Sequence, residues 1–302
     1  MLADLTGDLG VLIITGANQR GRADARKIYA HSCHQARSPT GRKILSTNLN
    51  CQLVAGLFGV LICVAAVNQP SSAQAAGNVQ AQLENGDLII TGDDRDNNII
   101  VIQECCSTVI VKGRADTTVN GSASRFDTQV THDIIIALNH GNDFVRVEVV
   151  PGVGGTMNDL KIRSGTGDDT VELLGVTVQN DTRIETGDGD DVIFIDGVQE
   201  PNVYQHPNFT GRFSVDADTG QDLLDFHHAI FRGEVNVTMG SGIDGVCNTE
   251  DSDFLQPDRA TFDGGPPNGF PGDGFVAPII QLPHIINFEE FPDDCSFLGG
   301  RD

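Results

Sequence analysis

Paired aspartates that follow glycine in two closely similar turns are the residues of this chain whose types and spacing could do chemistry. The stretch from Arg163 to Gly197 reads RSGTGDDTVELLGVTVQNDTRIETGDGDDVIFIDG and contains the pattern G-x-G-D-D-x-[VI] twice. Carboxylate oxygens and the backbone carbonyls of glycine turns are hard ligands, which suit Ca²⁺ better than a transition metal. The candidate ligands in these two turns are Gly167, Asp168, Asp169, Asp188, Gly189, Asp190 and Asp191.

The two turns belong to a longer series, which emerges when the chain is aligned on the second aspartate of the pattern. Three further turns fall in the same register, and successive aspartates are separated by 26, 22, 31 and 22 residues. The aligned positions are Asp143, Asp169, Asp191, Asp222 and Asp244. A period of this size indicates a solenoid of stacked coils.

Apolar residues alternate on both sides of each aligned turn, with Ile, Val, Leu or Phe at most of the positions nine and seven residues before the aspartate and two and four residues after it. This alternation predicts a strand, a turn and a second strand with one face inward. Two residues before each aspartate stands a glycine, which fits a turn position of positive φ. We therefore predict an all-β fold, a single-stranded right-handed parallel β-helix or solenoid with coils of about 22 to 31 residues and irregular caps.

Weaker coils flank the series. Residues 86–101 repeat the apolar positions with Asn97 in place of the aspartate, and residues 260–270 place Gly269 there. Terminal repeats of a solenoid are expected to be atypical because they close its open ends. The predicted segments are an N-terminal cap with a first degenerate coil (76–131), the repeat solenoid (132–246) and a Pro- and Gly-rich C-terminal cap (247–302) with a last strand within 285–291.

The stretches Ser164–Glu172 and Thr186–Phe194 resemble the G-G-x-G-x-D-x-U-x calcium repeat of RTX (haemolysin-type) proteins, and each departs from it only at the first glycine. In that family, tandem nine-residue repeats hold calcium between turns stacked on the same edge. In this chain the turn recurs only once per coil, a spacing that is more similar to a larger, three-sided parallel β-helix. The resemblance implies that the carboxylates of the aligned turns bind calcium, with Asp143, Asp222 and Asp244 as further ligands.

The stacking of carboxylates also favours a cation on physical grounds. If coils stack about 4.8 Å apart, two carboxylates within roughly 5 Å repel by about 3.5 kcal/mol at an effective dielectric constant of 20. We therefore expect calcium between the turns at Gly167 and Gly189. The alternative is that the aspartates hydrogen-bond to the backbone of their own turns and face water. This alternative is favoured at Asp222 and Asp244, which no second acid precedes. Zinc has little support, because His140 is the only His or Cys in the turns.

The chain of 302 residues carries a net charge of −23, which argues against a nucleic-acid partner and favours cations. Residues 1–75 differ from the rest, because they hold seven of the 19 Lys and Arg residues but only three of the 42 acids. Arg42 and Lys43, the apolar run 53–67 and the small residues ending at Ala75 follow the order of a secretory signal.

We therefore predict a signal peptide over residues 42–75, cleaved near Ala75, and a leader of unclear status over residues 1–41. The mature chain is then secreted or held at a bacterial cell surface without a stable membrane span, since the apolar run is short for one. An uncleaved anchor is the alternative.

Four cysteines follow the predicted cleavage site, and an exported chain meets oxidising surroundings. Cys247 and Cys295 both lie in the predicted C-terminal cap and could form a disulfide. Cys105 is separated from them by several coils of about 4.8 Å each, too far for a disulfide. Cys105 and Cys106 are then either a vicinal disulfide or two free thiols.

An enzyme is the main alternative to a scaffold, because parallel β-helices include polysaccharide lyases and hydrolases that use a base or a pair of carboxylates. The arginines at 146, 163, 183 and 212 fall at different places in their coils and predict no shared basic patch. His227 and His228 end a predicted strand, where adjacent residues point to opposite faces.

The largest insertion in the series, residues 196–211, contains Tyr204, His206 and Phe209 and is the candidate if the solenoid presents a binding loop; the alternative, which is favoured, is a surface excursion without a binding role. From all these features we predict an exported, non-catalytic, calcium-binding β-solenoid that serves as a structural or adhesive module. Its expected partners are calcium and either a surface polysaccharide or another surface protein. The alternative function is a carbohydrate-active parallel β-helix enzyme.

Overall fold

The computed structural model describes residues 50–51, 63–64, 77–152, 155–200, 203–250, 252–266, 272–276 and 284–289. The chain divides into two compact units, residues 1–74 and residues 75–302, at the junction where the sequence predicts signal cleavage. In the first unit, strands β1 (Asn50–Cys51) and β2 (Cys63–Val64) pair antiparallel. The predicted leader and the rest of the predicted signal peptide lie outside the described residues. The described part of the chain contains no helix long and apolar enough to cross a membrane.

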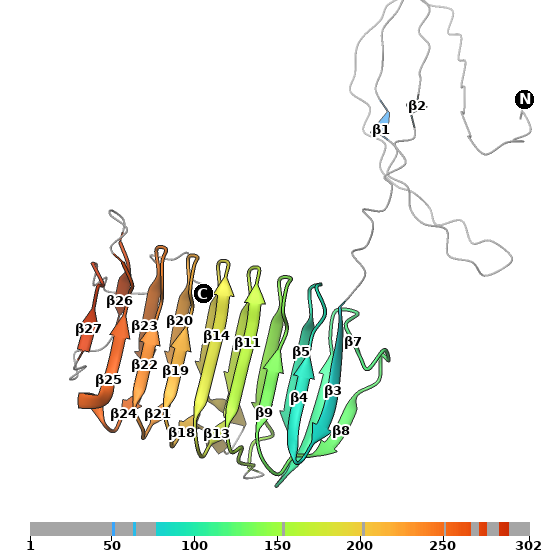
Figure 1. Ribbon diagram of the computed structural model, residues 1–302, viewed down its shortest axis with the longest axis horizontal. Coiled ribbons are helices and arrows are strands. Elements are labelled where there is room, and N and C mark those ends of the chain that lie inside the picture. Colours follow the sequence, from blue (N-terminus) through green and yellow to red (C-terminus); the bar gives the residue numbers. More distant parts are fainter. Residues whose placement is uncertain are drawn as a thin grey trace, which may run out of the picture. The chain divides into compact units, whose positions relative to one another are not determined.

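The second unit is all-β and is built on two long sheets whose strands are mostly parallel (Figure 1). The nine-stranded sheet has the order β26 (Gly274–Val276), β23 (Gly245–Glu250), β20 (Leu223–His227), β15 (Val192–Asp196), β12 (Thr170–Leu174), β10 (Phe144–Val149), β5 (Asn98–Gln103), β6 (Thr108–Gly113) and β8 (Phe126–Gln129).

The ten-stranded sheet has the order β27 (His284–Ile286), β25 (Ala260–Asp263), β22 (Val235–Thr238), β19 (Phe213–Asp216), β14 (Thr182–Asp188), β11 (Leu160–Thr166), β9 (Ile134–Ala137), β4 (Asp87–Thr91), β3 (Asn78–Glu84) and β7 (Thr118–Val119).

Smaller elements lie between these two sheets along the chain. A four-stranded parallel sheet contains β13 (Thr177–Val178), β18 (Asn208–Phe209), β21 (Ile230–Phe231) and β24 (Asp253–Phe254). Strands β16 (Val198–Glu200) and β17 (Val203–Gln205) form an antiparallel hairpin, and η1 (Pro257–Arg259) is a short 3₁₀ helix.

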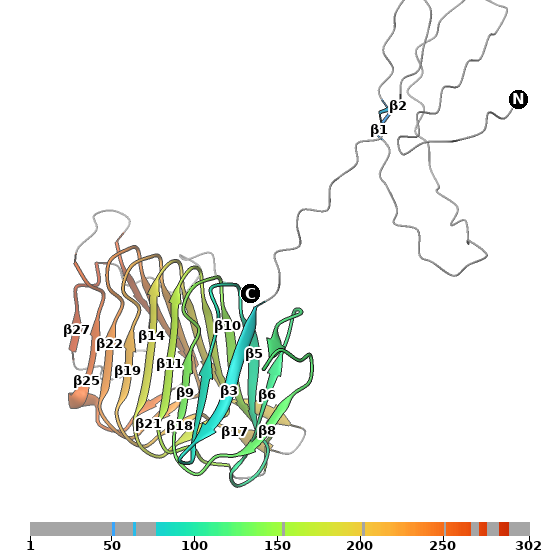
Figure 2. The ribbon, with the colours of Figure 1, turned by 45° about the vertical axis from the view of Figure 1, so that its right-hand side comes forward.

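The chain visits the sheets in a fixed order and returns to each of them in register, as the views in Figures 1 and 2 make plain. From β9 onward, a strand of the ten-stranded sheet is followed across one turn by a strand of the nine-stranded sheet. Equivalent turn residues are separated by 26, 22, 31 and 22 residues, as the sequence alignment predicts. The prediction of an all-β fold with parallel strands is thus confirmed, and the arrangement is compatible with a β-solenoid.

The inward residues of the two long sheets form the core. One register row of the ten-stranded sheet is at most 1% exposed and consists of Ile134, Leu160, Thr182, Phe213 and Val235 in this order. Toward the C-terminal end the core becomes rich in phenylalanine, and in the four-stranded sheet the rings stack from coil to coil, for example Phe231 on Phe254 at 4.9 Å between centroids. The apolar alternation in the sequence therefore sets which face of each strand is buried.

The two ends of the stack differ from each other. At the N-terminal end, β3 pairs antiparallel with β4 and β6 pairs antiparallel with both β5 and β8, so these strands interrupt the parallel order. At the C-terminal end, parallel pairing continues through β26 and β27, beyond the boundary at residue 246 where the sequence predicts an irregular cap. The last strand, predicted over residues 285–291, is β27, which begins one residue earlier, at His284, and already ends at Ile286.

Candidate functional site

The second aspartate of each aligned turn belongs to a continuous row of hydrogen bonds, which we call the inner ladder. Each carboxylate accepts, through Oδ1, the backbone N–H of the equivalent residue in the preceding coil. The donor and acceptor residues are Asn97 to Asp143 (2.6 Å), Asp143 to Asp169 (2.7 Å), Asp169 to Asp191 (2.8 Å), Asp191 to Asp222 (2.9 Å), Asp222 to Asp244 (2.9 Å) and Asp244 to Asp273 (2.9 Å). The inner ladder thus joins seven successive turns by side-chain to backbone bonds.

The C-terminal end of the inner ladder corrects the sequence alignment. Asp273, and not Gly269, occupies the position that follows Asp244. The step from one to the other is 29 residues, because the Pro- and Gly-rich segment makes this coil longer than the alignment allows. Asp273 is fully buried, and its own N–H donates to Oε2 of Glu289 at 2.9 Å.

Burial of the inner ladder changes its protonation. Asp143, Asp169, Asp191, Asp222 and Asp244 are at most 3% exposed. Burial raises the pKa of Asp143 and Asp222 to about 8 and that of Asp191 and Asp244 to about 7, against an ordinary value of 3.8. The neighbouring carboxylates of the ladder raise these pKa values further, whereas the bond from the backbone lowers them.

The two turns with the best-preserved pattern differ from the others in having a hydroxyl beside the inner carboxylate. Burial raises the pKa of Asp169 to about 6, and the nearby hydroxyl of Ser164, which donates to the carbonyl oxygen of Thr186, works in the opposite direction. Thr186 has the same position and effect beside Asp191. In all five inner aspartates the second carboxylate oxygen, Oδ2, is buried without a hydrogen-bond partner; these residues are Asp143, Asp169, Asp191, Asp222 and Asp244. A buried oxygen without a donor favours the protonated carboxyl.

The residues that directly precede the inner-ladder residues, from Asp96 to Gln221, lie in a separate, exposed row, which we call the outer ladder. Here the backbone N–H donates to the side chain of the preceding coil, so the polarity is opposite to that of the inner ladder. The pairs are Asn142 to Asp96 (2.9 Å), Asp168 to Asn142 (3.2 Å), Asp190 to Asp168 (3.1 Å) and Gln221 to Asp190 (2.9 Å). Asp188 stands one residue before Gly189 and accepts the hydroxyl of Thr219 at 2.7 Å.

Glycine at the turns is required by close contact between coils. Gly167 has φ of 122°, and a Cβ there would lie 2.2 Å from the carbonyl oxygen of Gly141. Gly189 has φ of 138°, and a Cβ there would lie 2.1 Å from the carbonyl oxygen of Gly167. The prediction of positive φ is confirmed at these positions but not at Gly242, where only the close contact with Gly220 remains.

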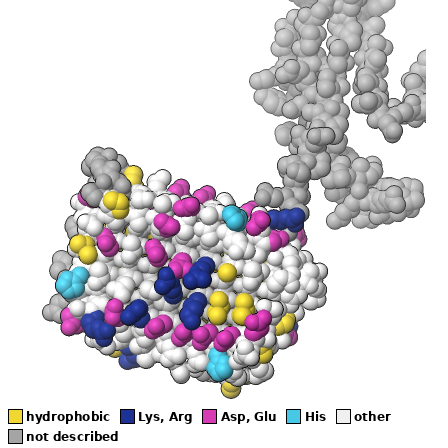
Figure 3. All heavy atoms as spheres, in the orientation of Figure 1, with side chains coloured by type: hydrophobic (Ala, Val, Ile, Leu, Met, Phe, Trp, Pro, Cys, Tyr) yellow, Lys and Arg dark blue, Asp and Glu magenta, His cyan; other side chains and the backbone are white. Residues whose placement is uncertain are grey.

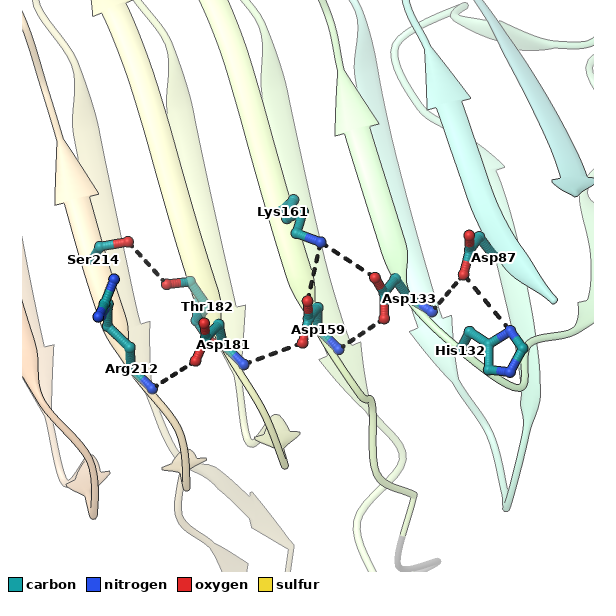
Figure 4. A network of polar contacts seen from close by, with 9 residues as sticks. All are labelled: Asp87, His132, Asp133, Asp159, Lys161, Asp181, Thr182, Arg212 and Ser214. Atoms are coloured by element: carbon teal, nitrogen blue, oxygen red, sulfur yellow. Dashed lines mark hydrogen bonds and ion pairs between the residues drawn. The ribbon is translucent and has the colours of Figure 1, made fainter. Parts of the chain in front are cut away.

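A third row of carboxylates, which the sequence analysis missed, lies where each coil enters the ten-stranded sheet (Figure 4). We call it the entry ladder. Its pairs run from backbone N–H to the Oδ1 of the preceding coil, from Asp133 to Asp87 (3.0 Å), Asp159 to Asp133 (3.3 Å), Asp181 to Asp159 (3.2 Å) and Arg212 to Asp181 (3.0 Å). These residues stand ten positions before the inner aspartates, so the same alignment contained the signal.

Lys161 compensates part of the negative charge of the entry ladder. Its Nζ lies 3.0 Å from Oδ2 of Asp159 and 3.2 Å from Oδ2 of Asp133, bridging two coils (Figure 4). The hydrogen bond to Asp159 raises the pKa of Lys161. In this row, therefore, a lysine of the protein acts as the counter-ion.

The predicted metal ligands do not converge on one point, because the two aspartates of each turn lie on opposite sides of the backbone. Asp169 and Asp191 are buried, whereas Asp168, Asp188 and Asp190 are exposed. Within the described residues, no group of three or more His, Cys, Asp or Glu side chains is arranged to hold a metal ion. The alternative expectation, bonding to the aspartate's own turn, also differs from the arrangement, since every ladder bond crosses to a neighbouring coil. Calcium binding stays a prediction.

A cluster of Lys and Arg side chains occupies the middle of the face drawn in Figure 3. The register places Lys161 beside Arg183 and Arg163 beside Glu185 on the outward side of β11 and β14. Both arginines form ion pairs with Glu185. Arg163 and Arg183, which the sequence analysis placed in no shared patch, thus lie together. The reason is that a coil of 22 residues places Arg163 beside Glu185, which also pairs with Arg183.

The insertion at residues 196–211 meets the two adjacent histidines, contrary to the expectation that these point to opposite faces. Strand β20 ends at His227, and His228 has φ of 53°, so the alternation of side chains stops there. Both histidines face Asp196, with His228 Nδ1 at 3.5 Å from Oδ1 and His227 Nδ1 at 4.0 Å from Oδ2. Tyr204 joins them through its hydroxyl, 2.7 Å from His228 Nδ1.

The structure decides one of the two open questions about the cysteines, the state of Cys105 and Cys106. Cys105 and Cys106 are exposed free thiols at the turn between β5 and β6. Cys247 is fully buried and disulfide-bonded. Its predicted partner, Cys295, lies outside the described residues.

Comparison of the chain with protein-family models, with curated proteins and with solved structures found no match. Functional inference therefore depends on the geometry of the ladders and of the inserted loop.

Proposed function

We propose that this chain is an exported, non-catalytic β-solenoid, coiled right-handedly, that serves as a structural or adhesive module at the cell surface or outside the cell. The observation that carries the proposal is the use of the turn carboxylates. In the inner, outer and entry ladders they bind backbone N–H groups of neighbouring coils, which maintains the spacing between coils. Carboxylates engaged in this way favour a structural role rather than acid and base catalysis.

Calcium is the cation that we propose for the outer ladder. Asp168, Asp188 and Asp190 remain exposed on adjacent coils, and the chain carries a net charge of −23. A divalent ion bound by one oxygen from each coil, with water completing its shell, would reduce the repulsion between these carboxylates. Because the part of the chain that the structure describes has no group of three ligands arranged for a metal, we expect weak binding, in the range of about 10⁻⁴ to 10⁻³ M that is typical of extracellular calcium modules.

Thermal melting with and without calcium tests whether the outer ladder binds this ion. Adding several millimolar calcium chloride to the EDTA-treated chain should raise the melting temperature, since a ligand that binds only the folded state stabilises it. The double variant Asp168→Asn, Asp190→Asn should lose most of this shift. Asp258→Asn, an exposed acid in η1 away from the turns, is the matched control and should keep it.

An unchanged melting temperature in the wild-type chain would refute calcium binding. An equal shift in the double variant would refute its assignment to the outer ladder. The alternative function, a carbohydrate-active enzyme, predicts new reducing or unsaturated ends when the chain is incubated with polysaccharides, and their appearance would refute the non-catalytic proposal.

A further inference from the structure

The inserted loop borders a hollow that none of the three ladders uses. The hollow has a volume of about 460 Å³, is open to solvent, and lies beside the four-stranded sheet and the β16–β17 hairpin. Small-molecule sites commonly measure about 300 to 1,000 Å³. Its lining includes Thr156, Thr177, Tyr204, His206, Asn208 and Ile230.

The aromatic wall of the hollow is held in place by hydrogen bonds. The Tyr204 hydroxyl lies 2.7 Å from Nδ1 of His228 and donates to Oδ1 of Asp196 at 3.2 Å. His206 Nδ1 lies 2.9 Å from the carbonyl oxygen of His228, and the Tyr204 and His206 rings meet edge to face at 4.6 Å. A binding surface whose rings are already fixed loses little conformational entropy when a ligand arrives.

Glycine allows the tyrosine ring to take this position. A Cβ at Gly197 would lie 2.5 Å from atoms of the Tyr204 ring, so any other residue would displace it. On the other side of the hairpin, Gln205 Nε2 donates to the carbonyl oxygen of Gly175 at 2.6 Å and anchors the loop to the previous coil. Tyr204, Gln205 and His206 are therefore fixed against the stack by hydrogen bonds.

The chemistry of the lining points to an uncharged ligand. None of the described residues that line the hollow is Lys, Arg, Asp or Glu, although the chain as a whole is strongly acidic. The rings of Tyr204 and His206 and the side chain of Ile230 offer apolar surface. In the same hollow, the threonine hydroxyls and the Asn208 amide offer hydrogen-bond donors and acceptors. A sugar ring has this dual character, with apolar C–H faces and a rim of hydroxyls. The negative charge of the protein disfavours an anionic sugar.

We propose that this hollow binds a neutral saccharide unit, with the rings of Tyr204 and His206 against the sugar and with Thr156, Thr177 and Asn208 hydrogen-bonded to its hydroxyls. The inference rests on the proposed adhesive function and names the ligand class of that function.

Affinity electrophoresis of the full chain tests the proposal. Native gels that contain dextran, a soluble β-1,3-glucan or a galactomannan should retard the chain in at least one case, whereas polygalacturonate, an anionic polymer, should not. Migration unaffected by all three neutral polymers, or retardation by polygalacturonate alone, would overturn it.

Two variants locate the site independently. Tyr204→Ala removes the main ring and should weaken binding about tenfold, the effect of losing a well-packed aromatic contact. Thr156→Arg places a long side chain on an exposed part of the lining that takes no part in the contacts among Tyr204, His228 and Asp196, so it remains informative if Tyr204→Ala does not fold. His140→Ala, an exposed histidine far from this loop in the fold, is the control and should bind as the wild type does. A folded Thr156→Arg chain with wild-type retardation would refute the site.

The same protein samples separate this inference from the proposed function. A chain whose melting temperature rises with calcium but which binds no neutral polysaccharide would refute the saccharide site and leave the calcium proposal standing. A chain that binds a neutral polysaccharide and releases reducing ends from it would refute the proposed non-catalytic function instead.

Discussion

At the scale of single residues, the inner aspartates act as acceptors for buried backbone N–H groups. Asp169, for example, donates its N–H to Asp191 and accepts the N–H of Asp143 through Oδ1. A buried N–H without an acceptor is costly, so the side chain of the next coil fills a position that no backbone carbonyl occupies. The aspartate is therefore required by the fold at the position where the sequence pattern also resembles a calcium repeat.

The first prediction compares adjacent aspartates of one turn. Asp191→Ala leaves the N–H of Asp169 buried without an acceptor and should lower the free energy of unfolding by about 1 to 3 kcal/mol. Asp190→Ala, its exposed neighbour, should change it by less than about 0.5 kcal/mol, because water can replace the lost acceptor. Urea unfolding at pH 5, where the inner carboxyl is protonated, measures both values. Equal effects of the two substitutions would contradict the separate roles of the ladders.

At the scale of elements, the turn between the two long sheets depends on glycine for two separate reasons. Gly187 has φ of 99°, and a Cβ there would lie 1.9 Å from the carbonyl oxygen of Gly165 in the preceding coil. Gly121, which lies outside these turns, between β7 and β8, provides the comparison. Its φ is 72°, and no atom lies within 4 Å of an added Cβ. The pair allows the cost of backbone conformation to be separated from the cost of contact between coils.

The second prediction uses this pair. Gly121→Ala should destabilise the chain by about 1 to 2 kcal/mol, the cost of a left-handed conformation with a Cβ. Gly187→Ala should cost clearly more, because the neighbouring backbone must also move. Denaturant unfolding of the two variants gives the difference. If both lose the same amount, contact between the coils is not what requires glycine at position 187.

At the scale of the whole molecule, the inner ladder couples stability to pH. The folded-state pKa of Asp143 and Asp222 is about 8, and that of Asp191 and Asp244 about 7, all above the ordinary value of 3.8. Between these values the folded chain holds more protons than the unfolded chain, so the free energy of unfolding must fall as pH rises. The large negative charge of the chain acts in the same direction.

The third prediction follows directly. In EDTA, the melting temperature should be highest near pH 5 and should decrease toward pH 8. Asp222→Asn, which cannot ionise but keeps an oxygen for the N–H of Asp191, should flatten the curve. Circular dichroism melts at pH 5, 6.5 and 8 test both statements. A melting temperature that rises over this interval would show that the inner carboxylates are ionised in the folded chain.

Much of the strand arrangement could be predicted from the sequence, because apolar alternation repeats at a readable period. Ile136, Ile162 and Ile184 are three aligned residues that the structure places side by side in one buried row. The error at Gly269 arose where the coil length changes and the turn carries several glycines and prolines. Alignment of a repeat by pattern fails there, since any of these residues can occupy a turn.

The candidate sites were less predictable. The entry ladder has its own sequence signal, an acid directly before the first apolar residue of a coil, but the signal is short and acids are common in this chain. The meeting of Tyr204, His228 and Asp196 has no local signal at all, because it depends on the φ of His228 and on the path of an inserted loop.

By itself, the sequence determined the period, the inward face of each strand and the row of aspartates, since these follow from the spacing of side chains along the chain. Only the tertiary structure decided what the aspartates touch. In the turn between β11 and β12, Asp169 is buried among the coils while its neighbour Asp168 stays in water. Whether a carboxylate meets a backbone N–H, a lysine or solvent depends on the stacking of coils, which no local pattern contains.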